Sequence, residues 1–407
     1  MPDQSLAPKR RILFVDDDQA ILDGLRNRLR RKRDLWDMHF ALGGQEALGM
    51  LANIPFDVIV TDMRMPGMDG ATLLKEVQVR YPDVVRIVLS GHAEFEAALR
   101  AVPVAHQFLA KPCDPGILEN VVERACQLQK LVSDAAVRAI VGRVSGLPAM
   151  PHVYSTLRRM LLDEHCTMSD IAGVIKQDTG ISAKLLQLVN SAFFRLSRPL
   201  CRIEEVVGYL GLDAINRLVL AGELFDGRGE PPEVRALLHD LQRHSVVTAT
   251  IASQLMTDKH QQEDAFIAAL LHDVGHMLLA VHLPEQHRTA VRLAETHHQT
   301  LHDAEVALFG VSHAEVGGYL LGIWGLPYFI VEAVANHHEP SRVGEANFGV
   351  LGAVHVSNVL AHVLLDDANR QPDWRFLERV GLTESWPVWL DRFREEAAIL
   401  SSRLVDG

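Results

Sequence analysis

Short apolar runs alternate with amphipathic stretches over about the first 130 residues of the chain. The run VIV at 58–60 is rich in β-branched residues and leads into a Pro/Gly-rich turn, as expected for a strand covered on both faces. The predicted strands are 11–15, 38–42, 56–62, 84–90 and 106–110. The predicted helices lie around 21–29, at 43–53, 71–81 and 94–102, and after Pro115. Five strands alternating with five helices predict an α/β domain with a doubly wound parallel sheet.

Five polar side chains fall directly after these strands, and a parallel sheet brings such positions together along one edge. They are Asp16, Asp17, Asp62, Ser90 and Lys111. Taken alone, Asp62 is more simply interpreted as a cap of the next helix. Three carboxylates at one edge repel one another unless a cation joins them, and Mg²⁺ prefers such oxygen ligands. A metal there would let one carboxylate attack a phosphoryl group, with Lys111 and Ser90 contacting its oxygens.

The motifs VDDD, TDMRMPGMDG, LSGHA and FLAKP resemble the receiver domain of two-component response regulators. The resemblance covers about residues 10–130 and implies a flavodoxin-like fold. It implies that Asp62 accepts phosphate from a cognate histidine kinase. It also implies that Asp16 and Asp17 bind Mg²⁺ together with Asp62 and the backbone carbonyl of Arg64.

Two further positions carry the switch that this resemblance implies. Ser90 would follow the phosphoryl group, and Phe108 would be the aromatic residue that swings inward with it. The Lys111–Pro112 bond is typically cis in such domains. We therefore expect phosphorylation to change the surface around the fourth strand and the last helix.

A long amphipathic stretch follows the fifth strand. Asp114 and Pro115 suit the N-cap and first position of a helix, which we predict to run through 114–145. Its apolar positions repeat every three or four residues. These positions are Leu118, Val121, Ala125, Leu128, Val132, Ala135 and Ala139. Burial on the sheet accounts for the first part, and beyond it we favour a coiled coil between the protomers of a homodimer, with packing on the next domain as the alternative.

The region 146–407 is predicted to be nearly all helical. Thr167 and Ser169 are candidate caps of one helix, and Gly211 breaks another. The turn-rich segment 227–233 divides the region into two parts. The sequence therefore predicts a helical second domain with its own internal boundary.

Histidines are concentrated in this second part: of 20 in the chain, 15 lie between His239 and His362. An adjacent His272–Asp273 pair inside an apolar helix is costly to bury unless each side chain has a partner, and His276 lies one turn further on the same face. A lone histidine is more often a satisfied polar group than a ligand. Imidazoles combined with a carboxylate suit Fe, Mn or Zn. The candidate ligands are His244, His272, Asp273, His313, His337 and His338.

The segments LPAMP, VIKQDTGISAKLLQLVNSAFF and VVGYLGLDAINRLVL resemble the HDOD domain, a relative of the HD-type metal-dependent phosphohydrolases. The resemblance covers about 146–350 and implies a helical domain that its family uses mainly as a regulatory or interaction output. The candidate ligands each align with a ligand position in catalytic HD relatives. Two departures count against catalysis. Asn358 stands where the HD pattern closes on an aspartate, and HHEPSRVGE lacks the DGxGYP sequence that follows HHE in cyclic-di-GMP phosphodiesterases.

Two functions follow as alternatives. In the first, which we favour, the phosphorylated receiver switches an output domain that binds a downstream protein. In the second, the output domain is a metal-dependent phosphohydrolase of a nucleotide or cyclic nucleotide, gated by the receiver. A transcription factor is disfavoured, because no helix-turn-helix with a basic recognition helix follows the receiver.

Composition narrows the cellular setting. The net charge of −12 disfavours a broad attraction to nucleic acid, and the basic run at 26–33 is interpreted as a solvated helix end. Four cysteines without CxxC spacing, and an N-terminus without an apolar segment, indicate a reduced, cytoplasmic protein. No uninterrupted apolar stretch of about 18 residues occurs, so no membrane span is predicted.

The expected organisation is a multidomain α/β plus all-α chain. It consists of a flexible tail, a receiver, a connecting helix, a two-part HDOD domain and C-terminal helices packed on that domain. The ranges are 1–9, 10–130, 114–145, 146–350 (with parts 146–226 and 234–362) and 363–407.

Overall fold

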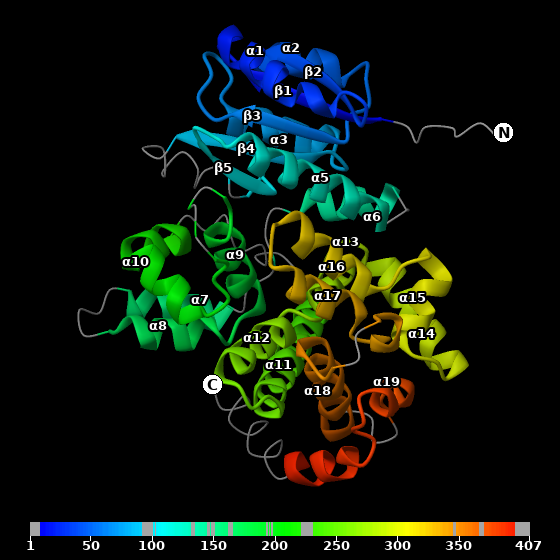
Figure 1. Ribbon diagram of the computed structural model, residues 1–407. Coiled ribbons are helices and arrows are strands. Elements are labelled where there is room, and N and C mark those ends of the chain that lie inside the picture. The colour runs from blue at the N-terminus through cyan, green and yellow to red at the C-terminus, as the bar shows by residue number, and fades with distance from the viewer. Residues whose placement is uncertain are drawn as a thin grey trace, which may run out of the picture. The chain divides into compact units, whose positions relative to one another are not determined.

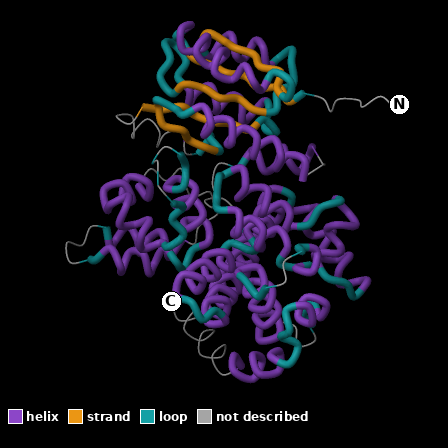
Figure 2. The backbone as a smooth tube through the Cα atoms, viewed as in Figure 1, coloured by secondary structure: helices purple, strands orange, loops and turns teal. Residues whose placement is uncertain are grey.

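The computed structural model describes residues 9–91, 101, 103–131, 135–144, 147, 151–161, 166–192, 194, 196, 198–220, 231–344, 347–365 and 370–394. The chain divides into two compact units. An N-terminal unit comprises Met1–Ser145 with the short segments Asn190–Ser197 and Ile323–Gly325, and a helical unit comprises the rest. Among the described residues the sheet lies in the N-terminal unit, whereas the helical unit is built of helices and loops (Figures 1 and 2).

The N-terminal unit is built on a five-stranded parallel sheet with strand order β2-β1-β3-β4-β5. The strands are β1 (Arg10–Asp16), β2 (Trp36–Leu42), β3 (Val58–Asp62), β4 (Val85–Gly91) and β5 (Gln107–Lys111). All five residues of β3 are buried, as expected for a central strand covered on both faces. The predicted doubly wound α/β fold is confirmed.

Helices cover both faces of this sheet. They are α1 (Gln19–Arg28), the 3₁₀ turn η1 (Leu29–Lys32), α2 (Gly44–Leu51), α3 (Gly70–Arg80) and α5 (Pro115–Leu131). Lys32 pairs with Glu123 and Glu119 of α5, at 2.5 and 3.5 Å, so η1 and α5 lie on one face. The strand order reverses direction at β1, and right-handed crossovers therefore place α2 and α3 on the opposite face. The helix predicted at 94–102 falls almost wholly outside the described residues.

Within 114–145, where one continuous helix is predicted, the described residues form two helices, and 132–134 between them lie outside the described residues. The first is α5, and the second is α6 (Ala135–Arg143). The fully buried Arg86 of β4 donates a hydrogen bond of 2.6 Å to the carbonyl oxygen of Gly142, which holds α6 against the N-terminal unit. Val137 and Val141 on α6 are buried. These two side chains therefore pack within one chain; of the predicted seam positions beyond 131, Val132 lies outside the described residues, and the coiled coil between protomers stays a prediction.

The helical unit contains the remaining elements. They are α7 (Pro151–Met160), α8 (Met168–Ile175), α9 (Thr179–Val189), α10 (Ile203–Leu220), α11 (Pro232–Leu255), α12 (Lys259–Leu270), α13 (Val274–His282), α14 (Pro284–His297), α15 (Leu301–Phe309), α16 (His313–Ile323), α17 (Tyr328–Asn336), η3 (Pro340–Arg342), α18 (Val350–Leu365) and α19 (Trp374–Arg379). Thr167 caps α8 in a capping box with Asp170, whereas Ser169 lies inside the helix. Gly211 breaks α10 with a φ of 77°. The segment 227–233 lies largely outside the described residues.

The C-terminal segment packs onto the long helices α11 and α18. Phe376, Trp386 and Phe393 share one hydrophobic cluster with Val247 of α11 and Val356 of α18. Trp386 and Phe393 belong to a last helical stretch at 385–394. The end of the described chain is therefore part of the core of the helical unit.

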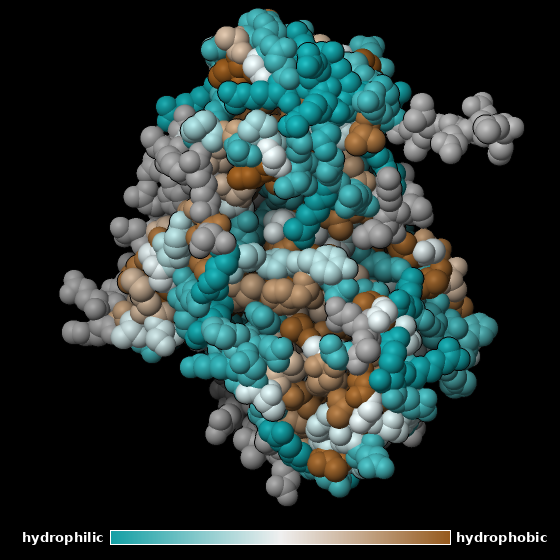
Figure 3. Space-filling model, in the orientation of Figure 1, coloured by the Kyte–Doolittle hydropathy of each residue, from teal (hydrophilic) through white to brown (hydrophobic). Residues whose placement is uncertain are grey.

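One helical stretch, Lys259–His282, has the length and apolarity of a membrane span. It comprises α12 and α13, and 78% of its most apolar window is buried inside the protein, as a core helix also is. On the face drawn in Figure 3, hydrophilic residues dominate around the sheet, and apolar residues gather in smaller patches over the helices.

Candidate functional site

The carboxyl edge of the sheet gathers three carboxylates. Asp16 ends β1 and Asp62 ends β3, so the parallel pairing of these strands places both at the same edge. Ligand oxygens of Asp16, Asp17 and Asp62 lie within 4.8 Å of one another. Asp16 and Asp62 are buried and Asp17 is exposed, so a cation bound here would remain open to water on one side.

Lys111 at the end of β5 completes the charge pattern of this edge. Its Nζ lies 2.9 Å from Oδ2 of Asp16 and forms an ion pair with Asp62. Burial lowers the pKa of Lys111, but the two carboxylates outweigh it and the net pKa is raised. Burial also raises the pKa of Asp62 against the opposing effect of Lys111. A single ammonium therefore leaves these carboxylates short of positive charge, which oxygen-preferring Mg²⁺ would supply.

The other predicted residues of the sheet edge also lie in or beside the sheet. The Arg64 backbone N–H donates to Oδ2 of Asp62 at 3.2 Å, which orients the carboxylate. Ser90 is fully buried near the end of β4, the neighbour of β3. Phe108 is 1% exposed, so in this structure the aromatic ring occupies an inward position. The Lys111–Pro112 bond is cis.

Gly70, the last residue of the TDMRMPGMDG motif, is needed at this site because of a close backbone contact. A Cβ added at Gly70 would lie 2.3 Å from the carbonyl oxygen of Asp62. Only glycine therefore lets the start of α3 approach the end of β3 so closely. The Pro/Gly-rich turn serves to hold the Asp62 backbone in place.

In the helical unit, three histidines point the same ring nitrogen at one carboxylate. The Nε2 atoms of His272, His313 and His337 lie 3.2, 3.5 and 3.9 Å from the side-chain oxygens of Asp273. Nδ1–H of each ring donates a hydrogen bond to another acceptor, at an Nδ1–oxygen distance of 2.6 Å for His272, 2.6 Å for His313 and 2.8 Å for His337. The acceptors are the carbonyl of Ala269, the carboxylate of Glu305 and the carbonyl of Val334. In the neutral rings, Nε2 therefore presents a lone pair to Asp273.

Lone pairs that face a buried carboxylate require a cation between them. Nε2 of His272 and of His337 has no hydrogen-bond partner among the described residues. Burial opposes ionisation of Asp273, but the neighbouring His272 and His313 hold its pKa well below the usual range. Burial lowers the pKa of His313, and Glu305 outweighs it, so the net pKa of that ring is raised. A proton on His313 or a metal ion satisfies the cluster, and the donor set fits Fe, Mn or Zn.

The remaining predicted ligands extend this cluster on both sides. Nε2 of His338 lies 2.8 Å from Nε2 of His313. Nε2 of His244 lies 2.9 Å from Oδ1 of Asn358, and burial lowers the pKa of His244 to about 4. The amide of Asn358 thus engages Nε2 of His244, whereas Nδ1 of that ring has no hydrogen-bond partner among the described residues. All seven predicted residues lie in one region of the helical unit, and the hydrogen-bonded pair His244 and Asn358 lies at one end of it.

Two residues that shape the cluster were not predicted from the sequence. Glu305 is fully buried and orients His313, yet an acidic residue in a helix eight positions before a histidine carries no distinguishing signal. Gly275 is the second: a Cβ there would lie 1.9 Å from the carbonyl oxygen of His313 and 2.6 Å from the backbone nitrogen of Gly317. This glycine lets α13 and α16 touch, which brings Asp273 to His313.

The parallel sheet with its acidic edge and lysine defines a receiver domain, and the helical unit carries an HD-like histidine cluster. Comparison with protein families agrees: the model of the response regulator receiver domain matches residues 12–123, and that of the HDOD domain matches residues 147–340. The chain therefore belongs to the response regulators that join an N-terminal receiver domain to a C-terminal HDOD domain.

Similar proteins cover parts of this architecture. An uncharacterized protein of Treponema pallidum is 25% identical over 254 residues, which is 62% of this chain and 49% of the relative. The hydrogenase transcriptional regulatory protein HoxA of Cupriavidus necator is 37% identical over 125 residues, 30% of this chain and 25% of the relative. This chain thus spans less than half of the length of both curated relatives. The crystal structure of a virulence factor from Campylobacter jejuni, 18% identical with a TM-score of 0.50, covers 67% of this chain and 98% of its own and shares the fold.

Proposed function

We propose that this response regulator accepts a phosphoryl group on Asp62 from a histidine kinase, in a reaction that requires Mg²⁺. The observation that supports the proposal is the gathering of three carboxylates within 4.8 Å of one another beside the ammonium of Lys111. Asp16, Asp17 and Asp62, with the carbonyl of Arg64, would hold the metal. Bound Mg²⁺ would screen the negative charge between the carboxylates and the incoming phosphoryl group.

The residues of the sheet edge have separate tasks in this transfer. A carboxylate oxygen of Asp62 forms the new bond to phosphorus while the bond from phosphorus to the kinase histidine breaks, and the leaving nitrogen keeps the electron pair. Lys111 contacts the phosphoryl oxygens as a point charge. The hydroxyl of Ser90 donates to one of these oxygens from the end of β4.

We infer a route from this event to the helix that leaves the receiver. Strand β4 carries Ser90 near its carboxyl end and Arg86 near its amino end. Arg86 in turn holds the carbonyl of Gly142 at the end of α6. A shift of β4 that follows the phosphoryl group would therefore reach α6, with Phe108 on β5 moving beside it. The output domain then acts by binding a downstream protein in the cytoplasm, and a homodimer remains a prediction.

Phosphorylation of Asp62→Asn, measured with acetyl phosphate and Mg²⁺, tests the first step. Wild-type protein should acquire an acyl phosphate that hydroxylamine removes, and Asp62→Asn should acquire none. Asp34→Asn is the matched control, because this exposed carboxylate precedes β2 and lies at the opposite end of the strands. Equal labelling of Asp62→Asn and wild-type protein would contradict the proposal, as would labelling that persists without a divalent metal.

A second candidate function rests on the lone pairs that face Asp273. In it, the HD-like cluster binds Fe, Mn or Zn and hydrolyses a phosphate ester of a nucleotide or cyclic nucleotide. The engagement of His244 by Asn358 and the absence of a DGxGYP sequence after His338 and Glu339 count against it. Metal content and nucleotide hydrolysis of purified protein separate the two functions.

The informative pair of variants for this candidate is Asp273→Asn and Asp240→Asn. Asp240 lies exposed on α11, so its variant should retain whatever metal the wild-type protein holds. Asp273→Asn removes the carboxylate shared by three imidazoles and should lose the metal. Absence of metal from wild-type protein, together with no hydrolysis after metal is added, would exclude the phosphohydrolase and leave protein binding as the function of the output domain.

A further inference from the structure

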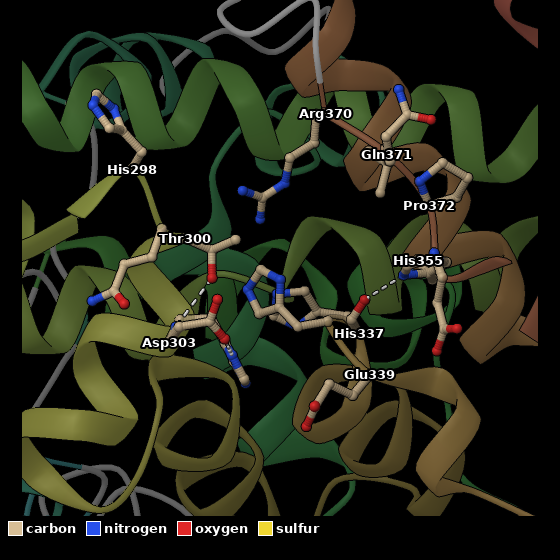
Figure 4. Close-up of a pocket in the computed structure, with 14 residues that line it drawn as sticks. His298, Thr300, Asp303, His337, Glu339, His355, Arg370, Gln371 and Pro372 are labelled. Carbon is tan, nitrogen blue, oxygen red and sulfur yellow. Dashed lines mark hydrogen bonds and ion pairs between the residues drawn. The ribbon is translucent and has the colours of Figure 1, made fainter. Parts of the chain in front are cut away.

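A cavity of about 900 Å³ lies against one side of the histidine cluster (Figure 4). It is bordered by the connection between α14 and α15, by the end of α17 and by the segment that follows α18. His337 and His338 of the cluster form part of its wall. Its size is that of a pocket for a small organic molecule.

Arg370 is the cation of this cavity. Its guanidinium group points into the cavity on the side of His337 (Figure 4). Arg370 lies beyond residue 340, where the match to the HDOD family ends. Among the described residues it forms no hydrogen bond and no ion pair, although a partly buried arginine normally has an anionic partner.

The segment that carries Arg370 is anchored across the cavity. The backbone N–H of Asp373 donates to Nε2 of His355 at 2.9 Å, and Nδ1 of the same ring lies 2.8 Å from the carbonyl of His337. The Asp373 carboxylate accepts the N–H of Ser341 at 3.2 Å. His355 thus connects the wall of the cluster to the Arg370 segment, so this arginine is held near its position before any ligand arrives.

The carboxylates that line the cavity are already engaged. Asp303, Glu339 and Asp373 each have a partner within the helical unit. These partners are Nδ1 of His302 at 3.2 Å, the guanidinium of Arg342 at 3.0 Å and the N–H of Ser341. Among the described Asp, Glu and Arg side chains that line the cavity, Arg370 is therefore the one without a hydrogen-bonding or ionic partner.

We propose that this cavity binds a small phosphate-bearing molecule, with its phosphate held by the guanidinium of Arg370 beside His337 and His338. A planar guanidinium presents paired N–H donors that match two phosphate oxygens. The volume beyond the phosphate accommodates the organic part of an ester. Such a ligand would act on the output domain as an input separate from phosphorylation of Asp62, and it requires neither that event nor a bound metal.

Calorimetric titration of the full-length, chelator-treated protein tests this site with inorganic phosphate, adenosine monophosphate and adenosine. A phosphate-bearing probe should bind, and Arg370→Gln should weaken that binding at least about 10-fold, the effect of losing a charged hydrogen-bond donor. The affinity of Arg370→Lys should lie between those of wild-type protein and Arg370→Gln, because lysine keeps the positive charge but lacks the paired N–H donors of the guanidinium. Arg375→Gln is the matched control, since Arg375 is exposed on α19 and does not line the cavity.

The outcomes distinguish the source of the phosphate and the independence of the site. Tighter binding of adenosine monophosphate than of inorganic phosphate indicates an ester, and the reverse indicates the free ion. Binding that persists in Asp62→Asn keeps this inference even if phosphorylation fails. Failure of both phosphate probes to bind wild-type protein would overturn it, as would equal affinity in Arg370→Gln and wild-type protein with matching thermal unfolding.

Discussion

Replacing Gly142 by alanine should release α6 from the receiver. A Cβ added at Gly142 would lie 1.6 Å from the carbonyl oxygen of Pro82 and 2.6 Å from its carbonyl carbon. Real Cβ contacts essentially never fall under 3.0 Å, and the obstacle here is backbone. The helix must therefore move away by more than an ångström, because no flexible side chain can yield instead.

The cost of that movement follows from the contacts that it breaks. Arg86 donates to the carbonyl of Gly142 at 2.6 Å, and Gln78 donates to the carbonyl of Arg143 at 3.2 Å. A hydrogen bond from a charged donor contributes about 1.5–3 kcal/mol and a neutral one about 0.5–1.5 kcal/mol. We therefore expect the free energy of opening α6 to fall by about 3 kcal/mol, which corresponds to about 100-fold faster amide exchange.

Hydrogen–deuterium exchange over 135–143 measures this change directly. Gly24→Ala is the matched control, because Gly24 lies in α1 with no atom within 4 Å of an added Cβ. That control should leave exchange in α6 unchanged and slightly stabilise α1, by about 0.5–1 kcal/mol. Unaltered exchange over 135–143 in Gly142→Ala would refute the docking of α6. If α6 relays the signal, the same variant should also lose the response of α6 to phosphorylation.

Three further predictions concern the helical unit. Asn358→Asp should bind Mn²⁺ at least about tenfold more tightly than wild-type protein in calorimetric titration, because a carboxylate replaces the amide beside His244. In chelator the same variant should be less stable to urea by about 1–3 kcal/mol, because it buries a further charge. The metal-free unit should also lose stability as pH falls below 6.5, because burial lowers the pKa of His244 to about 4, of His276 to about 3 and of His362 to about 2. The unfolded chain binds these protons first, so stability is full above pH 6.5 and each group costs about 2 kcal/mol by pH 5, which urea titrations across this range would reveal. Finally, burial raises the pKa of the Cys201 thiol to about 12, so mass spectrometry should find it alkylated by iodoacetamide only after unfolding.

Three results would contradict these predictions. Weaker metal binding by Asn358→Asp would mean that His244 does not belong to the metal site. A flat stability profile between pH 7 and pH 5 would mean that water reaches the buried rings. Rapid alkylation of Cys201 in the folded protein would mean that the segment before α10 opens locally.

The succession of strands and helices along the first 130 residues and the residues of the sheet edge were predictable from the sequence alone. Apolar runs of strand length, each ended by a polar residue, identify both the strand and its carboxyl end. A parallel sheet places such ends side by side, so the sequence predicts that Asp16, Asp62 and Lys111 lie close together. The prediction succeeds because it depends on local patterns and one topological rule.

The connecting helix could not be predicted in the same way. Its repeat of three and four residues is satisfied equally by a partner chain, by the next domain or by the receiver itself. The structure selects the receiver, because Arg86 is fully buried and finds an acceptor at Gly142. Neither residue carries that information in its sequence context, since the contact joins positions that are distant along the chain.

The histidine cluster lies between these cases. The sequence by itself determined which residues are candidate ligands, because imidazoles and a carboxylate in apolar helices demand partners. Only the tertiary structure decided which ring nitrogen each of them presents, through acceptors such as Glu305, and which helices touch, through Gly275. It also placed Arg370 beside the cluster. Side-chain orientation and close backbone approach arise from packing between helices, and the order of residues along one helix does not encode them.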